Sequence, residues 1–246
     1  MRYSEKTEKE VEKLSVAELL SDVKNAGHEV ILVSSGAIGM GVGKLSLPKR
    51  PEDIPTKQAA AAVGQCELMY TYDRLFSEYN HTVAQLLVTG SDVEDAQRRA
   101  HFHNTQYRQL ELGALPVINE NDTIATDEIV IGDNDTLSAI VAATVNADLL
   151  VLLSDIDGLY TADPRRDADA RLISVVDAIT PEIEALAGGN GSSLGTGGMV
   201  TKLRAARIAM DAGIDMVIAN GANPDLLYDI IENVPVGTRF TGRKPI

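Results

Sequence analysis

Short apolar runs without polar alternation constrain the fold of this 246-residue chain more than any other feature of its sequence. Each run has the length of a strand and is rich in Val, Ile and Leu, which is typical of strands covered on both faces. Helical patterns separate the runs, such as the apolar stripe of Leu137, Ile140, Val141 and Thr144. The runs are residues 30–33, 83–88, 115–118, 149–153 and 216–219.

Alternating strands and helices predict an α/β fold, a three-layer α/β/α sandwich with a mainly parallel central sheet. Ligands of such sheets bind beyond the carboxyl ends of the strands, so the loops after Val33, Val88, Ile118 and Leu153 are candidate site loops. A charged helix over residues 4–25, ended by Gly27, comes first, and no apolar strand precedes it. The chain has no internal repeat or obvious linker, which favours one domain over residues 1–246.

Composition limits the partners and the compartment. Lys and Arg number 22 against 36 Asp and Glu, a net charge of -14, so the average field repels polyanions and argues against a nucleic-acid partner. A single cysteine, Cys66, excludes a disulfide framework and favours the cytoplasm. No apolar stretch approaches the roughly 18 residues that cross a bilayer, so we expect no membrane association.

Glycines crowd the segment after the first apolar run, residues 34–44. Glycine permits positive φ and close backbone approach, so the amides of this segment can point at an anion. The segment is not a Walker A loop, because Ile38 and Leu45 stand where that motif requires Gly and Ser or Thr. The alternative interpretation is a flexible connection between a strand and a helix.

Two acidic segments lie at the ends of predicted secondary structure, one after a strand and one before a helix. Residues 119–122, Asn-Glu-Asn-Asp, follow a strand and suit an ammonium group or polar substrate, or they form a turn with local hydrogen bonds. Residues 132–135, Gly-Asp-Asn-Asp, precede a helix, and a simple N-cap explains only part of this charge. Between the two segments, residues 124–131 are expected to form a small hairpin over the site.

Two further segments suit a nucleotide. Ser154 and Asp155 end the most apolar strand, although Asp-Gly and Asp-Pro further on are ordinary turn signals. Residues 188–202 contain six glycines and lead into a helix bearing Leu203, Ala206 and Met210. Lys202 stands at the start of that helix, where a cation is unfavourable unless an anion is bound. The bland alternative is a disordered surface loop.

No metal site is predicted. The histidines are His28, His81, His101 and His103, and they show no ligand constellation. Cys66 belongs to an apolar helical stripe that also holds Ala59, Ala62, Val63, Met69 and Tyr70. We therefore expect Cys66 to be a buried structural thiol.

Taken in order, these segments resemble the amino-acid kinase family, and within it the kinases of L-glutamate. The resemblance covers the chain from about Ser15 onward and rests on five motifs. They are SSGAIGMG at Ser34, NEND at Asn119, GDND at Gly132, SDIDGLYTADPR at Ser154 and GTGGMVTK at Gly195.

The resemblance implies transfer of the γ-phosphoryl group of ATP, with Mg²⁺, to the side-chain carboxylate of L-glutamate, the first step of proline synthesis. It implies Asp135 and Lys202 as catalytic residues, with Asp135 orienting lysine and Lys202 stabilising the transferring group. The matching glutamate-binding residues are Ser35, Gly36, Asp122 and Asn134. The matching nucleotide-binding residues are Ser154, Asp155, Thr196, Gly197, Gly198, Met199, Val200, Thr201 and Lys202.

The chemistry agrees with this inventory of residues. A glutamate carboxylate has an ordinary pKa of about 4.3, so it is ionised at neutral pH and needs no general base. Catalysis then has to come from alignment and positive charge. Relatives are commonly homo-oligomers inhibited by proline, which makes proline an expected inhibitor and a homo-oligomer the expected assembly.

The resemblance departs at the front of the chain. The family opens with an apolar strand ending in a Lys-x-Gly-Ser-Ser segment, and Lys6, Lys9 and Lys13 do not occupy that context. Losing one oriented donor costs about 10²-fold or more in rate. We therefore expect an N-terminally incomplete domain that is weakly active or inactive and marginally stable, without the C-terminal PUA domain of many relatives. The alternatives are a kinase of another carboxylate or carbamate and a non-catalytic nucleotide or amino-acid binding protein.

Overall fold

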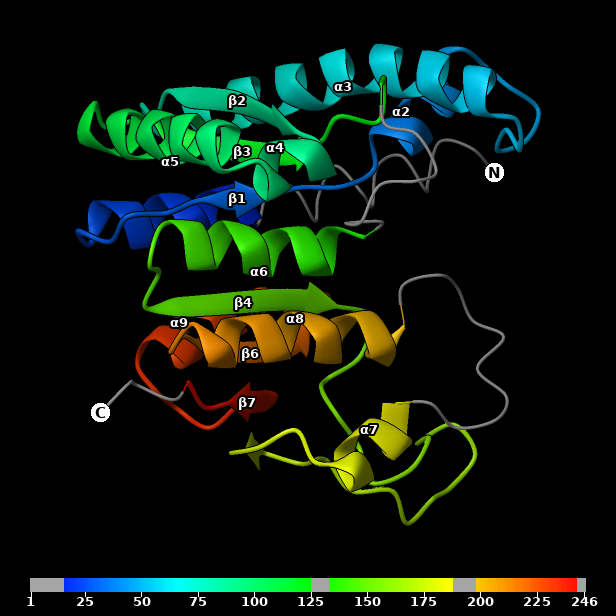
Figure 1. The fold of residues 1–246 in the computed structure, drawn as a ribbon, viewed down its shortest axis with the longest axis vertical. Coiled ribbons are helices and arrows are strands. Elements are labelled where there is room, and N and C mark those ends of the chain that lie inside the picture. The colour runs from blue at the N-terminus through cyan, green and yellow to red at the C-terminus, as the bar shows by residue number, and fades with distance from the viewer. Residues whose placement is uncertain (1–15, 125–132, 188–197, 243–246) are drawn as a thin grey trace. The chain divides into compact units, whose positions relative to one another are not determined.

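The computed structural model describes residues 16–124, 133–187 and 198–242. The chain divides into two compact units, Met1–Asn134 and Asp135–Ile246. Strands and helices alternate through both of them (Figure 1). The single domain expected over residues 1–246 stays a prediction.

Unit 1 is built on a three-stranded parallel sheet in the order β1-β3-β2. β1 is Leu32–Val33, β3 is Leu115–Glu120 and β2 is Val83–Val88. Val33 pairs with Ile118, and Val88 pairs with Glu120, so the three strands end at the same edge. The three apolar runs predicted as strands in this unit are therefore confirmed, although β1 is shorter than expected.

Helices of unit 1 begin and end largely where the sequence signals them. Residues 16–25 are helical, and Gly27 follows with φ 98°, as expected for a C-cap. The earlier part of that predicted helix, residues 4–15, lies outside the described residues. Asp53 caps α3 by accepting a hydrogen bond from the Thr56 amide at 2.9 Å. The labelled helices are α2 (Ala37–Lys44), α3 (Ile54–Ser77), α4 (Gly90–Glu94) and α5 (Ala96–Glu111).

The glycine-rich segment 34–44 differs from the expected loop, because α2 occupies it from Ala37 onward. Its glycines serve packing as well as loop geometry. A Cβ added to Gly41 would lie 1.8 Å from the carbonyl oxygen of Ala60, and one added to Gly64 would lie 1.7 Å from that of Ala37. α2 and α3 therefore cross with their backbones in contact, which only glycine at these two positions permits.

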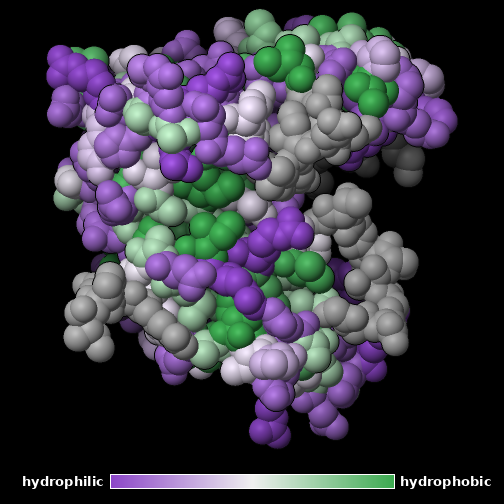
Figure 2. Space-filling model, in the orientation of Figure 1, coloured by the Kyte–Doolittle hydropathy of each residue, from purple (hydrophilic) through white to green (hydrophobic). Residues whose placement is uncertain are grey.

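The predicted buried stripe of α3 is wrong for Ala59, Ala62, Cys66 and Tyr70, which are exposed. Tyr70 is 64% exposed. The face that packs against the core of the unit is rotated from the expected one and carries Ala60, Ala61, Gly64, Leu68, Leu75 and Phe76. The prediction failed because α3 is apolar on two sides, so periodicity alone did not decide which one is covered. Hydrophobic side chains are visible on the outer surface over α3, at the top of Figure 2.

Unit 2 contains a four-stranded sheet in the order β4-β6-β7-β5. The β4–β6 and β5–β7 pairs are parallel, and β6 and β7 are antiparallel. Its strands are β4 (Leu149–Ser154), β5 (Val175–Val176), β6 (Asp215–Asn220) and β7 (Thr238–Phe240). Its helices are α6 (Asn134–Thr144, starting at the unit boundary), α7 (Pro181–Ala187), α8 (Met199–Asp211) and α9 (Leu226–Ile231).

Helices cover both faces of this second sheet. Met216 and Ile218 of β6 pack in a cluster with Leu203, Ala206 and Met210 of α8. The alternate residues Val217 and Ala219 pack with Leu226 and Ile230 of α9. Because successive side chains of a strand point to opposite faces, this is the helix, sheet and helix layering that the sequence predicted.

Candidate active site

The carboxyl ends of β1 and β3 bring two of the predicted site loops together in unit 1. The Ser34 amide donates a 2.8 Å hydrogen bond to the carbonyl of Ile118, which continues the strand ladder past β1. The loop of Ser34, Ser35 and Gly36 therefore runs beside the start of residues 119–122. Both predicted site loops therefore lie at one edge of this sheet, and their role in binding stays a prediction.

The first loop ends in an N-terminus of α2 that is shaped by glycine. Gly36 is the N-cap and has φ 97°, a conformation that favours glycine. Its carbonyl accepts the first helical hydrogen bond, from the Met40 amide at 2.9 Å. Ser35 and Gly36 are exposed, so the unpaired amides at this helix start are accessible to an anionic group.

The second loop carries two carboxyl groups with raised pKa values. Burial is the main reason that the pKa of Glu120 lies above its ordinary value, and the charges of Asp122 and Asp133 add to the effect. Burial also raises the pKa of Asp122, against an opposing effect of Arg50. Carboxylates desolvated beside one another are stabilised by a cation, so the loop suits an ammonium group.

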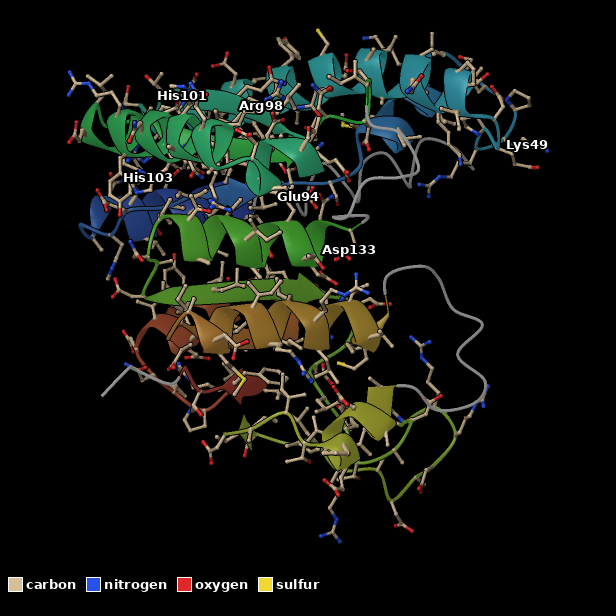
Figure 3. All side chains as sticks on the ribbon, in the orientation of Figure 1. Lys49, Glu94, Arg98, His101, His103 and Asp133 are labelled. Atoms are coloured by element: carbon tan, nitrogen blue, oxygen red, sulfur yellow. The ribbon has the colours of Figure 1, made fainter. Side chains whose placement is uncertain are left out.

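Asn134 is the first residue of α6, and its side chain carries a hydrogen-bond acceptor that no described residue uses. Its side-chain Oδ1 is buried and has no hydrogen-bond partner among the described residues. Asp133 precedes it at the amino end of α6 (Figure 3), and Asp135 follows it in the first helical turn. A buried acceptor without a donor costs free energy, which a donor on a bound substrate would recover.

Asp135 and Lys202 meet in unit 2 at the starts of two helices. Lys202 Nζ lies 3.1 Å from Asp135 Oδ2, and the side chain of Lys202 is only 10% exposed. The hydroxyl of Thr201 donates to the same carboxylate oxygen at 2.7 Å. Lys202 stands in the first turn of α8, where the helix end repels a cation. Asp135 therefore holds the lysine in place beside two helix N-termini, an arrangement that attracts anions.

The carboxyl end of β4 forms the second cluster of unit 2. Ser154 pairs with Asn220 across β4 and β6, and the Gly221 amide donates to the Ser154 carbonyl at 2.7 Å. Asp155 is exposed and accepts a 3.2 Å hydrogen bond from the Ser154 hydroxyl. Hydrogen bonds from Asn220 and Tyr160 lower the pKa of Asp157. Polar groups thus end both of these parallel strands, as expected for a ligand edge.

Parts of the predicted nucleotide segment can be placed. Gly198 is the N-cap of α8, and Met199, Val200, Thr201 and Lys202 make its first turn. Thr196 and Gly197 lie outside the described residues. So does the hairpin expected at residues 124–131, apart from Ile124. The roles of all these residues stay predictions.

Several polar residues that support the site were missed by sequence analysis. Gln65 and Tyr72 of α3 form hydrogen bonds with Asn119 and Ser34 of the two predicted site loops. Thr238 is fully buried and accepts from the Leu159 amide at 2.8 Å, which fixes the turn after β4. Polar residues within apolar helix or strand patterns were the available signal, because such groups need partners when buried.

Histidines contribute no metal centre in the described part of the chain. His101 and His103 both project from α5 (Figure 3). Among the described residues, no three His, Cys, Asp or Glu side chains group as metal ligands would.

Comparison with known proteins shows which family the chain belongs to. The model of the amino acid kinase family matches residues 6–220. The chain is 54% identical to "Glutamate 5-kinase" of Clostridium perfringens over 95% of its own length and 88% of that protein. It is 52% identical to "Glutamate 5-kinase" of Listeria innocua over 95% of its length and 86% of that protein. The chain belongs to the amino-acid kinase family.

Solved structures share this family's fold. The carbamate kinase from Giardia lamblia bound to AMP-PNP aligns with a TM-score of 0.64 at 17% identity, covering 94% of this chain and 89% of that one. The isopentenyl phosphate kinase of T. acidophilum aligns with a TM-score of 0.56 at 20% identity, covering 94% and 90%. This amino-acid kinase has no helix among its described residues long and apolar enough to span a membrane.

Proposed function

We propose that this amino-acid kinase transfers the γ-phosphoryl group of ATP to the side-chain carboxylate of L-glutamate, giving L-glutamyl 5-phosphate for proline biosynthesis. The observation that carries the proposal is Lys202, a cation buried at the start of α8 and held by Asp135. Relatives named "Glutamate 5-kinase", 54% and 52% identical over most of the chain, support the choice of substrate.

Phosphoryl transfer to a carboxylate needs positive charge more than it needs a base. The acceptor is already anionic at neutral pH, and the donor is a polyanion. Lys202 offsets negative charge on the transferring group, and Asp135 fixes its ammonium group at 3.1 Å. The carboxylate orients the lysine because it also accepts the Thr201 hydroxyl, which restricts its own rotation.

Acceptor recognition is assigned to unit 1. Asp122, helped by Glu120, balances the charge of the α-ammonium group of glutamate, and Asn134 Oδ1 accepts a hydrogen bond from that group. Ser35 and the Gly36 turn offer donors to a carboxylate of glutamate. Two carboxylates with raised pKa values favour a free amino acid over N-acetylglutamate or carbamate, which have no ammonium group.

Nucleotide binding is assigned to unit 2. Ser154 and Asp155 at the end of β4 bind the nucleoside part of ATP, and the segment Thr196 to Lys202 binds its phosphates. Mg²⁺ accompanies ATP and neutralises phosphate charge. Mg²⁺ in such sites is held by the substrate phosphates and by only one or two protein carboxylates. The exposed carboxylate of Asp155 would supply such a ligand, so the residues fit a hydrated ion held chiefly by the phosphates.

The remaining expectations belong to the same proposal. The enzyme works in the cytoplasm, forms homo-oligomers and is inhibited by proline, the end product of its pathway. Proline carries the same α-ammonium and α-carboxylate charges as glutamate, so residues that recognise those groups would respond to both.

The test is trapping of the acyl phosphate with hydroxylamine in the presence of Mg²⁺ and ATP. Parallel reactions contain L-glutamate, L-aspartate, N-acetyl-L-glutamate or carbamate. We expect a hydroxamate and matching ADP release with L-glutamate, and little of either with the others. Preference for another acceptor, or thermal stabilisation by ligands without any trapped product, would contradict the proposal.

A further inference from the structure

α3 holds both substrate loops of unit 1 through two buried polar side chains. Gln65 and Tyr72 are seven residues apart, so they lie on the same side of the helix. Gln65 is 6% exposed and Tyr72 is 8% exposed. Tyr72 shares a 2.8 Å hydrogen bond with the Ser34 hydroxyl in the first loop, and Gln65 contacts Asn119 at the start of the second.

The direction of the Gln65 hydrogen bond is fixed by the backbone. The Glu120 amide donates to Asn119 Oδ1 at 2.9 Å, and a backbone N–H is always the donor. The other end of the Asn119 amide is therefore its NH2 group. That group donates to Gln65 Oε1 at 2.9 Å, so the amide orientations of both side chains follow from the Glu120 N–H.

This chain of contacts ends at residues 119–122, called the acidic loop below. Asn119 is 2% exposed, and both ends of its amide are used, one by Gln65 and one by the backbone of Glu120. Without an acceptor at Gln65, the buried NH2 of Asn119 would lose its partner and its amide could rotate. Glu120 and Asp122 follow in the same loop, and their carboxylates need fixed positions to meet an ammonium group.

Gln65 accepts this bond while leaving its own donor unused. Its Nε2 is buried and has no hydrogen-bond partner among the described residues. An unpaired buried donor lowers stability, so a residue kept for stability alone would be better replaced by an apolar side chain. The unused donor is consistent with a role of Gln65 in the site rather than in the core.

We propose that Gln65 is a positioning residue for the amino-acid substrate, acting through Asn119 to fix the Glu120–Asp122 loop. The inference rests on the proposed function, because it assigns Gln65 to the glutamate half of that site. Gln65 lies outside the five motifs that point to the family and was not among the predicted site residues.

The first experiment compares Gln65→Met with Gln106→Met. Gln106 of α5 is a matched control, because it is 0% exposed and both of its amide atoms lack hydrogen-bond partners among the described residues, so it makes no hydrogen bond to Asn119. We expect Gln65→Met to raise the KM and the calorimetric Kd for L-glutamate by roughly three- to tenfold. The KM for ATP should stay unchanged, and Gln106→Met should change neither constant.

The second experiment is a double-mutant cycle with Asn119→Ala, read out as the Kd for L-glutamate. If Gln65 acts through Asn119, the double variant binds glutamate as weakly as Asn119→Ala alone. Two outcomes would overturn the inference, provided that the wild type binds glutamate. One is a double variant whose loss of affinity equals the sum of the two single losses, and the other is a Gln65→Met variant with an unchanged Kd for glutamate. A wild type that binds no glutamate would overturn the proposed function, and this inference with it.

Discussion

Single residues from distant parts of the chain meet in the candidate site. Asp135 and Lys202, which are 67 positions apart, were assigned from separate motifs, and the structure places Lys202 Nζ 3.1 Å from Asp135 Oδ2. Asp122 was assigned in the same way and lies in the acidic loop. Gln65 and Tyr72 gave no motif, because a polar residue inside an amphipathic helix looks the same whether it is exposed or buried against a loop.

The burial of Asp122 in the acidic loop predicts that the protein becomes more stable when this side chain carries no charge. Its pKa is raised in the folded protein, so the folded state binds protons more tightly than the unfolded state. The contribution of Asp122 to stability is therefore greatest below its ordinary pKa and is lost as pH rises through the raised value. Asp122→Asn should be more stable than the wild type at pH 7.5, with the difference vanishing below the ordinary pKa of Asp.

Chemical denaturation at several pH values measures this difference, and glutamate binding is followed in parallel. We expect the Asn variant to bind L-glutamate more weakly, since it loses the charge that balances the ammonium group. A variant less stable than the wild type at pH 7.5 would show that the Asp122 carboxylate is stabilised by its surroundings.

The thiol of Cys66 predicts a simple labelling result. Because Cys66 is exposed on α3, an aromatic disulfide reagent should modify it in the native protein at nearly the rate seen in denaturant. Protection of the thiol until the protein unfolds would support the burial that the sequence first indicated.

At the scale of elements, the strands were the most predictable part of this fold. β2 matches its predicted run, and β3, β4 and β6 extend the predicted runs by one or two residues. β5 and β7 were missed, because two or three residues are too few for a hydrophobic pattern. The face of α3 was predicted wrongly because two of its sides are apolar, and its crossing partner α2 was taken for a loop.

The backbone contact between α2 and α3 predicts that a single added methyl group strongly lowers the free energy of unfolding. Gly64→Ala would place a Cβ 1.7 Å from the backbone oxygen of Ala37, so we expect a loss of about 3 kcal/mol or more. Gly43→Ala is the control on α2, where an added Cβ meets nothing within 4 Å. Alanine is the better helix former, so this control should gain about 0.5–1 kcal/mol.

Thermal unfolding distinguishes the two substitutions. Gly64→Ala should lower Tm by roughly 6–12 °C, and Gly43→Ala should leave it equal or higher. Equal, small changes in both variants would mean that α2 and α3 are not in backbone contact.

For the whole molecule, the sequence predicted the layered α/β fold and the family. It did not predict the division at Asn134 and Asp135, because no linker composition marks that boundary. The net charge of -14 belongs to the 246-residue sequence as a whole and opposes the approach of anionic ATP. Lys202 is a local exception whose buried ion pair is screened less than the surface charges.

This charge predicts an unusual dependence on salt. Raising the ionic strength from about 0.01 M to about 0.15 M shortens the Debye length from about 30 Å to about 8 Å. The repulsion between the protein and ATP should weaken, and the KM for ATP should fall at constant free Mg²⁺. A KM that rises with KCl would show that local cations, rather than the net charge, govern nucleotide approach.

The central claim is that buried Lys202, held by Asp135, supplies charge to the transferring phosphoryl group. The most direct measurement is the single-turnover rate of glutamyl phosphate formation at saturating ATP and L-glutamate in Lys202→Met, with Arg204→Met as the exposed control on α8. We predict a loss of about 10²-fold or more for Lys202→Met and the wild-type rate for Arg204→Met. A Lys202→Met enzyme that forms glutamyl phosphate at the wild-type rate would contradict the claim.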